Sequence, residues 1–233
     1  MRLNRTLLAA GVAVALLAGC KKAQDDVAAT PEAVAANEAV ATGADDADAA
    51  GEAVTETPAV APAVVAFDIN SVPVSDKPLG EWPYIAMPAG YVLGHADDLP
   101  SRSKDLARVP VWTGGQLLWV EGRVFSDRMT SAEGKTHSKF ELRKGLQQAI
   151  EALGGVRLAE RNFDEAVQQA NEQALDDFRG EFSDLHDAYW HGNDADTWVI
   201  RRADKAIWVV TQADNSDGAI MVAEGPLPAV PTP

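Results

Sequence analysis

Two histidines in a polar stretch have the residue types and near spacing that could bind a metal ion. His186 and His191 are five residues apart in "SDLHDAYWHG", and Asp187 lies between them. Imidazole and carboxylate groups are zinc ligands, but a zinc-binding helix places its two histidines four residues apart, as in H-E-x-x-H. His186, Asp187 and His191 are therefore metal candidates whose spacing departs from that of helical zinc sites.

Other catalytic signatures are missing from the sequence. It contains no G-x-S-x-G, no P-loop and no dinucleotide-binding G-x-G-x-x-G, and Cys20 is the only cysteine. His95 and His137 have no partners that can be read from their neighbours along the chain. We therefore predict that the protein is not an enzyme and holds no cofactor.

The clearest strand signal is "VPVWTGGQLLWVEGRVF", residues 109–125. Gly114-Gly115 is a two-residue turn of the kind that closes a β-hairpin. In that register Val111 pairs with Leu118, and one face of the hairpin is purely aliphatic. The other face combines Trp112 and Trp119 with charged side chains.

Aromatic residues on that charged face are the second set of candidate functional side chains. Either a helix or the Pro-rich segment that contains Trp82 and Tyr84 covers Trp112 and Trp119, or these residues form an exposed aromatic patch. Exposed aromatic side chains with polar neighbours are typical of binding surfaces. Trp112, Trp119, Trp82 and Tyr84 are therefore the predicted partner-binding face, and a glycan- or peptidoglycan-binding module is one alternative function.

Two predicted helices and several strands position these residues. Residues 67–91 are rich in proline and glycine, which predicts extended segments and turns. A helix begins at the capping pair Ser138 and Glu141 and ends at Gly154-Gly155. "GVRLAE" predicts a short strand, and a second helix spans about 164–179.

The last part of the chain predicts three strands, "DTWVIRR", "KAIWVVTQA" and "GAIMVAE", which short turns join into an antiparallel meander. Asn162 and Glu165 form a capping pattern before the second helix. The fold class predicted from this order of elements is α+β, a mostly antiparallel sheet with two helices packed on one face, preceded by a disordered tether.

The N-terminus predicts export and lipid attachment. Arg2 and Arg5 precede the 12-residue apolar stretch Leu7–Ala18, which is shorter than the roughly 20 residues of a transmembrane helix. The following "LAGC" resembles the lipobox of bacterial lipoproteins. That resemblance implies a signal peptide over residues 1–19, a covalent lipid on Cys20, and, with lysine rather than aspartate at position 21, anchoring in the outer membrane with the domain facing the periplasm.

Composition divides the rest of the chain into three parts. Residues 20–66 are an acidic, Ala-rich segment without aromatic residues, which predicts the disordered tether. Residues 67–225 predict a single α+β domain, and residues 226–233 predict a Pro-rich disordered tail. The whole chain has a net charge of −15, which argues against nucleic acid as a partner.

"FDINSVPVSDKPLGEWPYIAMPAGY", "VWTGGQLLWVEGRVF" and "VIRRADKAIWVV" together resemble the N-terminal region of some OmpA-family lipoproteins, over roughly residues 67–224. In those proteins a C-terminal OmpA-like domain grips peptidoglycan, and the sequence to Pro233 has no such domain. We therefore predict a lipid-anchored, non-enzymatic envelope protein, a binding or structural module for another envelope component. The alternative that uses His186 and His191 is a periplasmic metal-dependent hydrolase or metal-binding protein.

Overall fold

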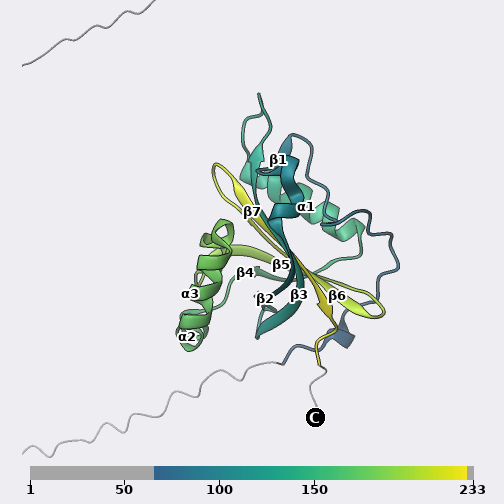
Figure 1. Ribbon diagram of the computed structural model, residues 1–233, viewed down its shortest axis with the longest axis vertical. Coiled ribbons are helices and arrows are strands. Elements are labelled where there is room, and N and C mark those ends of the chain that lie inside the picture. The colour runs from purple at the N-terminus through teal and green to yellow at the C-terminus, as the bar shows by residue number, and fades with distance from the viewer. Residues whose placement is uncertain (1–65, 230–233) are drawn as a thin grey trace, which may run out of the picture. The chain divides into compact units, whose positions relative to one another are not determined.

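The computed structural model describes residues 66–229, and the predicted signal peptide, Cys20 and nearly all of the predicted tether lie outside the described residues. The described part folds around an antiparallel sheet (Figure 1). Its seven strands are β1 (Tyr91–Leu93), β2 (Ser103–Trp112), β3 (Leu117–Ser131), β4 (Val156–Arg161), β5 (Asp194–Arg201), β6 (Lys205–Ala213) and β7 (Gly218–Pro226).

Three α-helices and four short 3₁₀ segments complete these residues. They are α1 (Lys139–Ala152), α2 (Glu165–Ala170), α3 (Glu172–Glu181), η1 (Ile69–Ser71), η2 (Ala96–Arg102), η3 (Ser183–Leu185) and η4 (Asp187–Tyr189). The predicted α+β class with a mostly antiparallel sheet is confirmed. None of the helices between residues 66 and 229 is long and apolar enough to cross a membrane.

The strand order is β1-β3-β7-β6-β5-β4, and β2 also pairs with β3. One edge of β3 pairs with β7 from Arg123 to Met129, while its other strand partners are β2 and β1. The predicted hairpin register is confirmed, because Val111 lies opposite Leu118 and Trp112 lies opposite Leu117. The β5-β6-β7 meander is confirmed as well.

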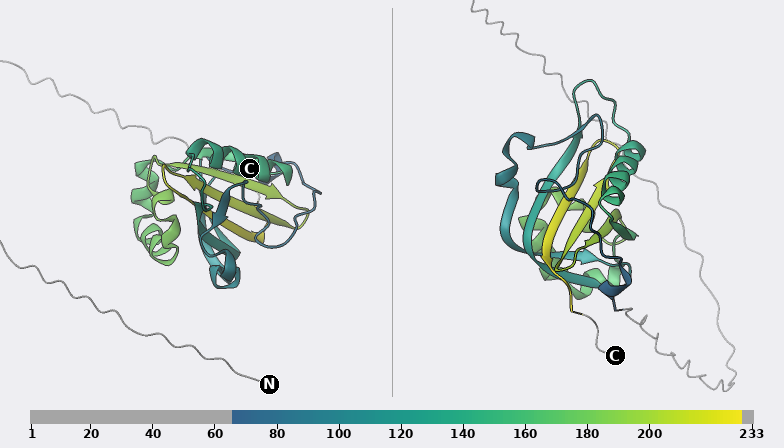
Figure 2. Two further views of the ribbon diagram at one scale, coloured as in Figure 1. Left: turned by 90° about the horizontal axis from the view of Figure 1, so that it is seen from above. Right: turned by 90° about the vertical axis from the view of Figure 1, so that its right-hand side faces the viewer.

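The β2-β3 hairpin reaches the strand at the other end of the sheet order. Gly114 at its tip has a φ of +88°, and a Cβ placed there would lie 2.9 Å from the carbonyl oxygen of Leu158 on β4. A larger residue would therefore be strained by its backbone conformation and would also collide with β4. The sheet is strongly curved, as Figure 2 shows, and its concave side encloses a core.

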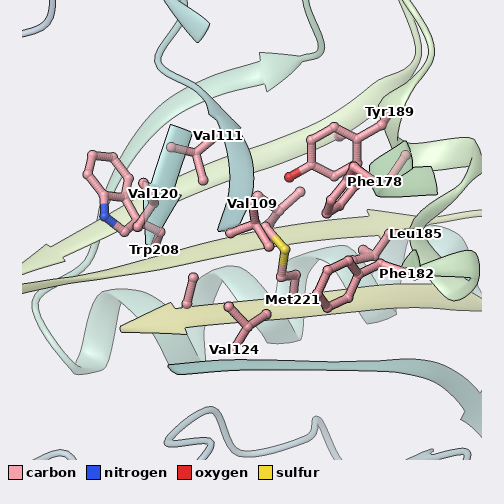
Figure 3. Packing of buried hydrophobic residues seen from close by; sticks show 14 of the residues in the cluster. Val109, Val111, Val120, Val124, Phe178, Phe182, Leu185, Tyr189, Trp208 and Met221 are labelled. Carbon is pink, nitrogen blue, oxygen red and sulfur yellow. The ribbon is translucent and has the colours of Figure 1, made fainter. Parts of the chain in front are cut away.

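Side chains on the two faces of the sheet form two apolar clusters, because successive residues of a strand point to opposite faces. Trp208 and Val210 of β6 belong to the first cluster, and Ile207 and Val209 belong to the second. Figure 3 shows part of the first cluster, including Val109, Val111, Val120, Val124, Phe178, Phe182, Leu185, Tyr189, Trp208 and Met221.

The prediction that two helices pack on one face is wrong. Leu142, Leu146 and Ile150 of α1 belong to the second cluster, whereas Leu175 and Phe178 of α3 belong to the first. The two helices therefore cover opposite faces, on either side of the strands in Figure 1. Helix periodicity identifies the apolar stripe of each helix, but it does not say which face of the sheet that stripe covers.

The helix predicted over residues 164–179 is two helices. Asn171, with φ −124° and ψ 16°, separates α2 from α3. The predicted cap at Asn162 is wrong, because the side chain of Asp164 accepts the hydrogen bond from the Val167 amide. The Asn162 side chain instead donates to the carbonyl oxygen of Ala188, 2.6 Å away. By contrast, Ser138 caps α1 as predicted.

The folded body extends slightly beyond the predicted domain end at residue 225. β7 includes Pro226, and Leu227 packs against the first cluster. At the other end, Phe67 packs edge-on against Trp208, with ring centroids 5.7 Å apart. Both ends of the described segment therefore contribute to the same core.

Candidate functional site

The structure divides the predicted partner-binding face into two groups. Trp82 and Tyr84 pack against the second cluster, and Trp112 and Trp119 pack against the first. All four side chains are half-buried. The four residues therefore do not form one continuous aromatic surface.

Trp82 and Tyr84 belong to a group that we call the Trp82 cluster, which consists of Trp82, Tyr84, Arg123, Lys205 and Glu224. The two rings meet edge-on with centroids 5.2 Å apart, and the Arg123 guanidinium lies 4.4 Å from the Trp82 ring centroid. The Tyr84 hydroxyl donates to Glu224 at 2.6 Å, and Lys205 donates to the same carboxylate at 2.8 Å. Each polar member of the cluster thus has a partner inside the domain.

These contacts change the proton affinities of two side chains. Burial, and then the hydrogen bond to Glu224, raises the pKa of Tyr84 to about 12. Burial by itself would raise the pKa of Glu224, but the hydrogen bonds from Lys205 and Tyr84 outweigh it and leave the pKa of Glu224 below its ordinary value. At neutral pH the cluster therefore contains a neutral phenol and a carboxylate that is held ionised.

Trp112 and Trp119 are also engaged inside the domain. Trp112 packs edge-on against the buried ring of Phe163, with centroids 6.2 Å apart. Arg108 lies 4.6 Å from the Trp119 ring centroid and 3.8 Å from a Glu121 carboxylate oxygen. A ring face stacked by arginine is not free to stack on a sugar, which favours a structural role for these aromatic residues.

The candidate metal ligands lie on the η3–η4 region and the turn that follows it. His186 Nδ1 is 2.9 Å from the Asp187 carboxylate, and the His186 ring packs against Trp190. The His191 backbone amide donates to the side chain of Gln168. Within residues 66–229, no three His, Cys, Asp or Glu side chains are grouped so that they could hold a metal ion.

A histidine–carboxylate pair that the sequence did not predict joins two distant segments. Asp127 is fully buried on β3, and its carboxylate accepts hydrogen bonds from the His95 backbone amide at 2.9 Å and pairs with His95 Nδ1 at 2.7 Å. Arg102 Nε lies 3.6 Å from the same carboxylate. The His95–Asp127 pair holds η2, and His95 immediately before it, against β3. The available signal was the position of Asp127, between Phe125 and Met129 on the buried face of its strand.

One aromatic side chain lies almost entirely in solvent. Phe140, at the start of α1, is 79% exposed. Two hollows adjoin it and share Lys144 as a lining residue; one is formed with Pro88 and Gly145, and the other with Arg157. We call this region the Phe140 surface, defined by Phe140, Lys144, Pro88, Gly145, Arg143 and Arg157.

Two arginines of the Phe140 surface form ion pairs with the buried carboxylate of Asp196. Asp196 is only 4% exposed, and Arg143 donates two hydrogen bonds to it, at 2.6 and 2.8 Å. Arg157 Nη1 lies 3.5 Å from the same carboxylate. The hydrogen bonds to Asp196 raise the pKa of Arg143 above its ordinary value. This network connects α1 to β4 and β5, so charge-assisted hydrogen bonds hold the helix against the sheet.

The Phe140 surface also carries a cation that forms no ion pair within the described part of the chain. Lys144 is exposed, and among residues 66–229 no carboxylate lies within ion-pair distance of it. Nearby Lys139 pairs with Asp194 at 3.1 Å, and this hydrogen bond lowers the pKa of Asp194. A signal for Phe140 was present in the sequence: it precedes Leu142 by two residues, about 200° around the helix, on the side opposite the buried stripe.

Comparisons with known proteins add no relatives. No protein-family model matches the chain, no curated protein matches it, and no solved structure matches it. The resemblance to the N-terminal region of some OmpA-family lipoproteins therefore remains a prediction.

Proposed function

We propose that this chain is a lipid-anchored protein of the bacterial outer membrane, without enzymatic activity, whose domain faces the periplasm and docks another envelope protein through the Phe140 surface. The lipobox-like "LAGC" with Cys20 supports the anchor and its location. The Phe140 surface supports the docking role. The proposal replaces the predicted aromatic face with a different surface of the same domain.

The observation that carries the docking role is the exposure of Phe140. A phenyl ring that is 79% exposed contributes little to folding, and it lies between two hollows on a helix. Aromatic side chains with this placement are typical anchor residues of protein interfaces. The ion pairs around Asp196 keep the helix in place before a partner binds, which reduces the entropy lost on binding.

Charge suggests the chemistry of the partner. The part of the chain from residue 67 onward has 26 acidic and 16 basic residues, a net charge of −10. Against that background, Lys144 forms no ion pair with any residue between 66 and 229 and lies next to Phe140. The surface therefore fits a protein segment with an apolar side chain that covers Phe140 and a carboxylate that reaches Lys144.

A photo-cross-linking amino acid at position 140 of the full-length, lipid-anchored protein tests the docking role in cells. We expect one dominant envelope protein in the adducts, identified by mass spectrometry. The matched control is the same substitution at Leu106, which is 77% exposed on β2. Adducts at position 140 that are absent at position 106 support the proposal.

Lys144→Glu in the same background tests the charge argument. Reversing this charge should reduce the adduct at position 140 several-fold, because a partner carboxylate would then face a carboxylate. Absence of any reproducible adduct at position 140, or the same adducts at positions 140 and 106, would rule out the Phe140 surface as the docking site.

The anchor has a separate test. Cys20→Ser should move the protein from the membrane fraction to the soluble periplasmic fraction, because a lipidated cysteine is the proposed hydrophobic attachment. An unchanged membrane fraction would contradict the lipobox interpretation without affecting the docking role.

A further inference from the structure

A polar hollow lies at one rim of the sheet, where β4 ends, β5 begins and β6 turns toward β7. Its volume is about 390 Å³, within the range of about 300–1,000 Å³ that is typical of small-molecule sites. The residues that line it are Lys139, Arg161, Asp187, Gly192, Asn193, Asp194, Gln212 and Asp214. None of them is aromatic or aliphatic, and none belongs to the Phe140 surface.

One lining residue is a buried amide without a hydrogen-bond partner. Gln212 on β6 is only 7% exposed, and its side chain forms no hydrogen bond with any residue between 66 and 229. Its amide atoms are not sealed off, in contrast to the enclosed indole nitrogen of Trp208. A carboxamide has two donors and one acceptor, and burying them unpaired is costly. A polar molecule in the hollow would supply the missing partner.

The end of the hollow at β4 and β5 has an excess of positive charge. Lys139 Nζ lies 3.1 Å and Arg161 Nε lies 3.6 Å from the carboxylate of Asp194, so two cations share one anion. The Lys139 hydrogen bond, and further the charges of Lys139 and Arg161, lower the pKa of Asp194. The Arg161 side chain is 73% exposed and forms no hydrogen bond with another described residue. Its guanidinium donors are therefore available to a ligand carboxylate.

The end of the hollow at the β6-β7 turn carries a carboxylate without a cation. Asp214 is half-buried, and no cation between residues 66 and 229 lies within ion-pair distance of it, because Lys139 and Arg161 pair with Asp194. His137 Nε2 donates to the Asp214 carbonyl oxygen at 2.8 Å, and the Asp214 amide donates to the Asp217 carbonyl at 2.8 Å. The backbone that carries the Asp214 carboxylate is thus fixed before a ligand arrives.

The lining argues against several other classes of ligand. The described residues contain no three His, Cys, Asp or Glu side chains that are grouped to hold a metal ion. A nucleobase would find no aromatic ring in the hollow on which to stack. A molecule with only a carboxylate would leave Asp214 unpaired, and one with only an ammonium group would leave Arg161 unpaired. The divided charge fits a small molecule that has both groups.

We propose that this hollow binds a free α-amino acid. The ligand carboxylate pairs with Arg161 and Lys139, the ligand ammonium group pairs with Asp214, and the Gln212 amide hydrogen-bonds to the ligand side chain. Because no apolar residue lines the hollow, the site prefers a small polar side chain such as that of serine. The site shares no residue with the Phe140 surface, so either proposal can fail without the other.

The test is a titration of the ¹⁵N-labelled full-length protein in detergent micelles with L-serine, followed by NMR at the side-chain amide of Gln212. Gln212→Glu identifies that signal, because the signal disappears in this variant. We expect a saturable shift. Two matched probes each lack one charge: N-acetyl-L-serine has no ammonium group, and L-serinamide has no carboxylate. Each should bind about tenfold more weakly than L-serine, since each loses one charge-assisted contact.

Two variants separate the two ends of the hollow. Arg161→Gln should weaken L-serine binding about tenfold and leave the affinity for L-serinamide unchanged, because that probe has no carboxylate to lose. Asp214→Asn should weaken L-serine binding by a similar factor and leave the affinity for N-acetyl-L-serine unchanged. The matched control is Asp217→Asn, at an exposed position of the same turn that does not line the hollow, which should retain full affinity.

The outcomes that would overturn the proposal do not depend on the variants alone. No saturable shift at high millimolar L-serine would overturn it, as would equal affinity for L-serine and the two singly charged probes. Loss of affinity in Asp217→Asn equal to that in Asp214→Asn would also contradict it. Should Arg161→Gln or Asp214→Asn fail to fold, the comparison of the three probes on the unaltered protein decides.

Discussion

The Trp82 cluster and the Phe140 surface both carry an aromatic side chain among charged groups, but they differ in how those groups are satisfied. In the Trp82 cluster, Arg123 stacks on Trp82, and Tyr84 and Lys205 bond to Glu224. On the Phe140 surface, the ring is 79% exposed and Lys144 has no carboxylate partner among the described residues. The contacts of the first region serve the fold, whereas Phe140 and Lys144 of the second are left exposed by the described residues.

The difference shows that aromatic residue type and charged neighbours do not by themselves identify a binding face. Tryptophan next to charged residues in the sequence predicted a partner-binding face, but in the fold arginines stack on Trp82 and Trp119, and Trp112 packs against another aromatic ring. Phe140 was not among the residues predicted to bind a partner, yet folding left it exposed. Unsatisfied side chains on a rigid element are the better criterion.

The largest expected effect on stability comes from removing Asp196, whose carboxylate pairs with two arginines of the Phe140 surface. Asp196→Ala should lower the free energy of unfolding by about 3 kcal/mol, because it leaves the half-buried guanidinium groups of Arg143 and Arg157 without their shared carboxylate. Urea unfolding followed by tryptophan fluorescence measures this change. The control is Asp194→Ala, at a carboxylate with 50% of its side chain exposed, which should cost less than about 1 kcal/mol. Equal losses in the two variants would contradict a special role for Asp196.

The next largest effect on stability compares the aromatic side chains of Trp82 and Phe140. Trp82→Ala should cost about 2 kcal/mol, less than a fully buried tryptophan would, because Trp82 is half-buried but loses its packing and its hydrogen bond to Ser103. Phe140→Ala should change the free energy of unfolding by less than about 0.5 kcal/mol. The two variants are compared by thermal and urea unfolding. Similar losses would remove the distinction between a structural and a docking aromatic residue.

A smaller effect depends on pH and separates the Trp82 cluster from the rest of the domain. Since the pKa of Glu224 is lowered in the folded state, its stabilisation is present above the ordinary glutamate pKa and is lost as pH falls through the folded value. Glu224→Gln should cost about 1 kcal/mol at neutral pH. It should also flatten the fall of stability as pH falls below the ordinary glutamate pKa. Parallel pH profiles for the two proteins would show that Glu224 is not held ionised by its neighbours.

The smallest effect on stability should accompany a large effect on docking. Lys144→Ala should leave the free energy of unfolding within about 0.5 kcal/mol, because Lys144 is exposed and forms no ion pair with a described residue. In cells the same variant should reduce the cross-link from position 140. A loss of folding that accompanies the loss of the adduct would assign Lys144 to the fold instead.

The elements with strong local signals were predicted correctly from the sequence. The Gly114-Gly115 turn determined the hairpin register, and Ser138 with the Leu142, Leu146 and Ile150 stripe determined α1. Where two local signals competed, the prediction was wrong: Asn162 and Asp164 both suit a helix cap, and only Asp164 caps α2. The choice depended on the contact between Asn162 and Ala188, which is not local.

The contacts of the candidate side chains were harder to predict, because they join residues that are distant in sequence. Asp127 lies 32 residues from His95, and Glu224 lies 140 residues from Tyr84. The alternation along β3 indicated that Asp127 was inward-facing, but no local pattern named its partner. Whether an aromatic ring becomes exposed likewise depends on which distant segment covers it.

The sequence by itself determined the local elements of this protein, since turns, caps and apolar periodicity act between residues that are near neighbours in the chain. Only the tertiary structure decided that α1 and α3 cover opposite faces, that arginines stack on Trp82 and Trp119, and that Phe140 is left exposed. Gly225 illustrates both levels: its lack of a side chain is evident from the sequence. The reason for it becomes known only when β3 and β7 lie side by side, because a Cβ at position 225 would lie 2.4 Å from the Glu121 carbonyl oxygen.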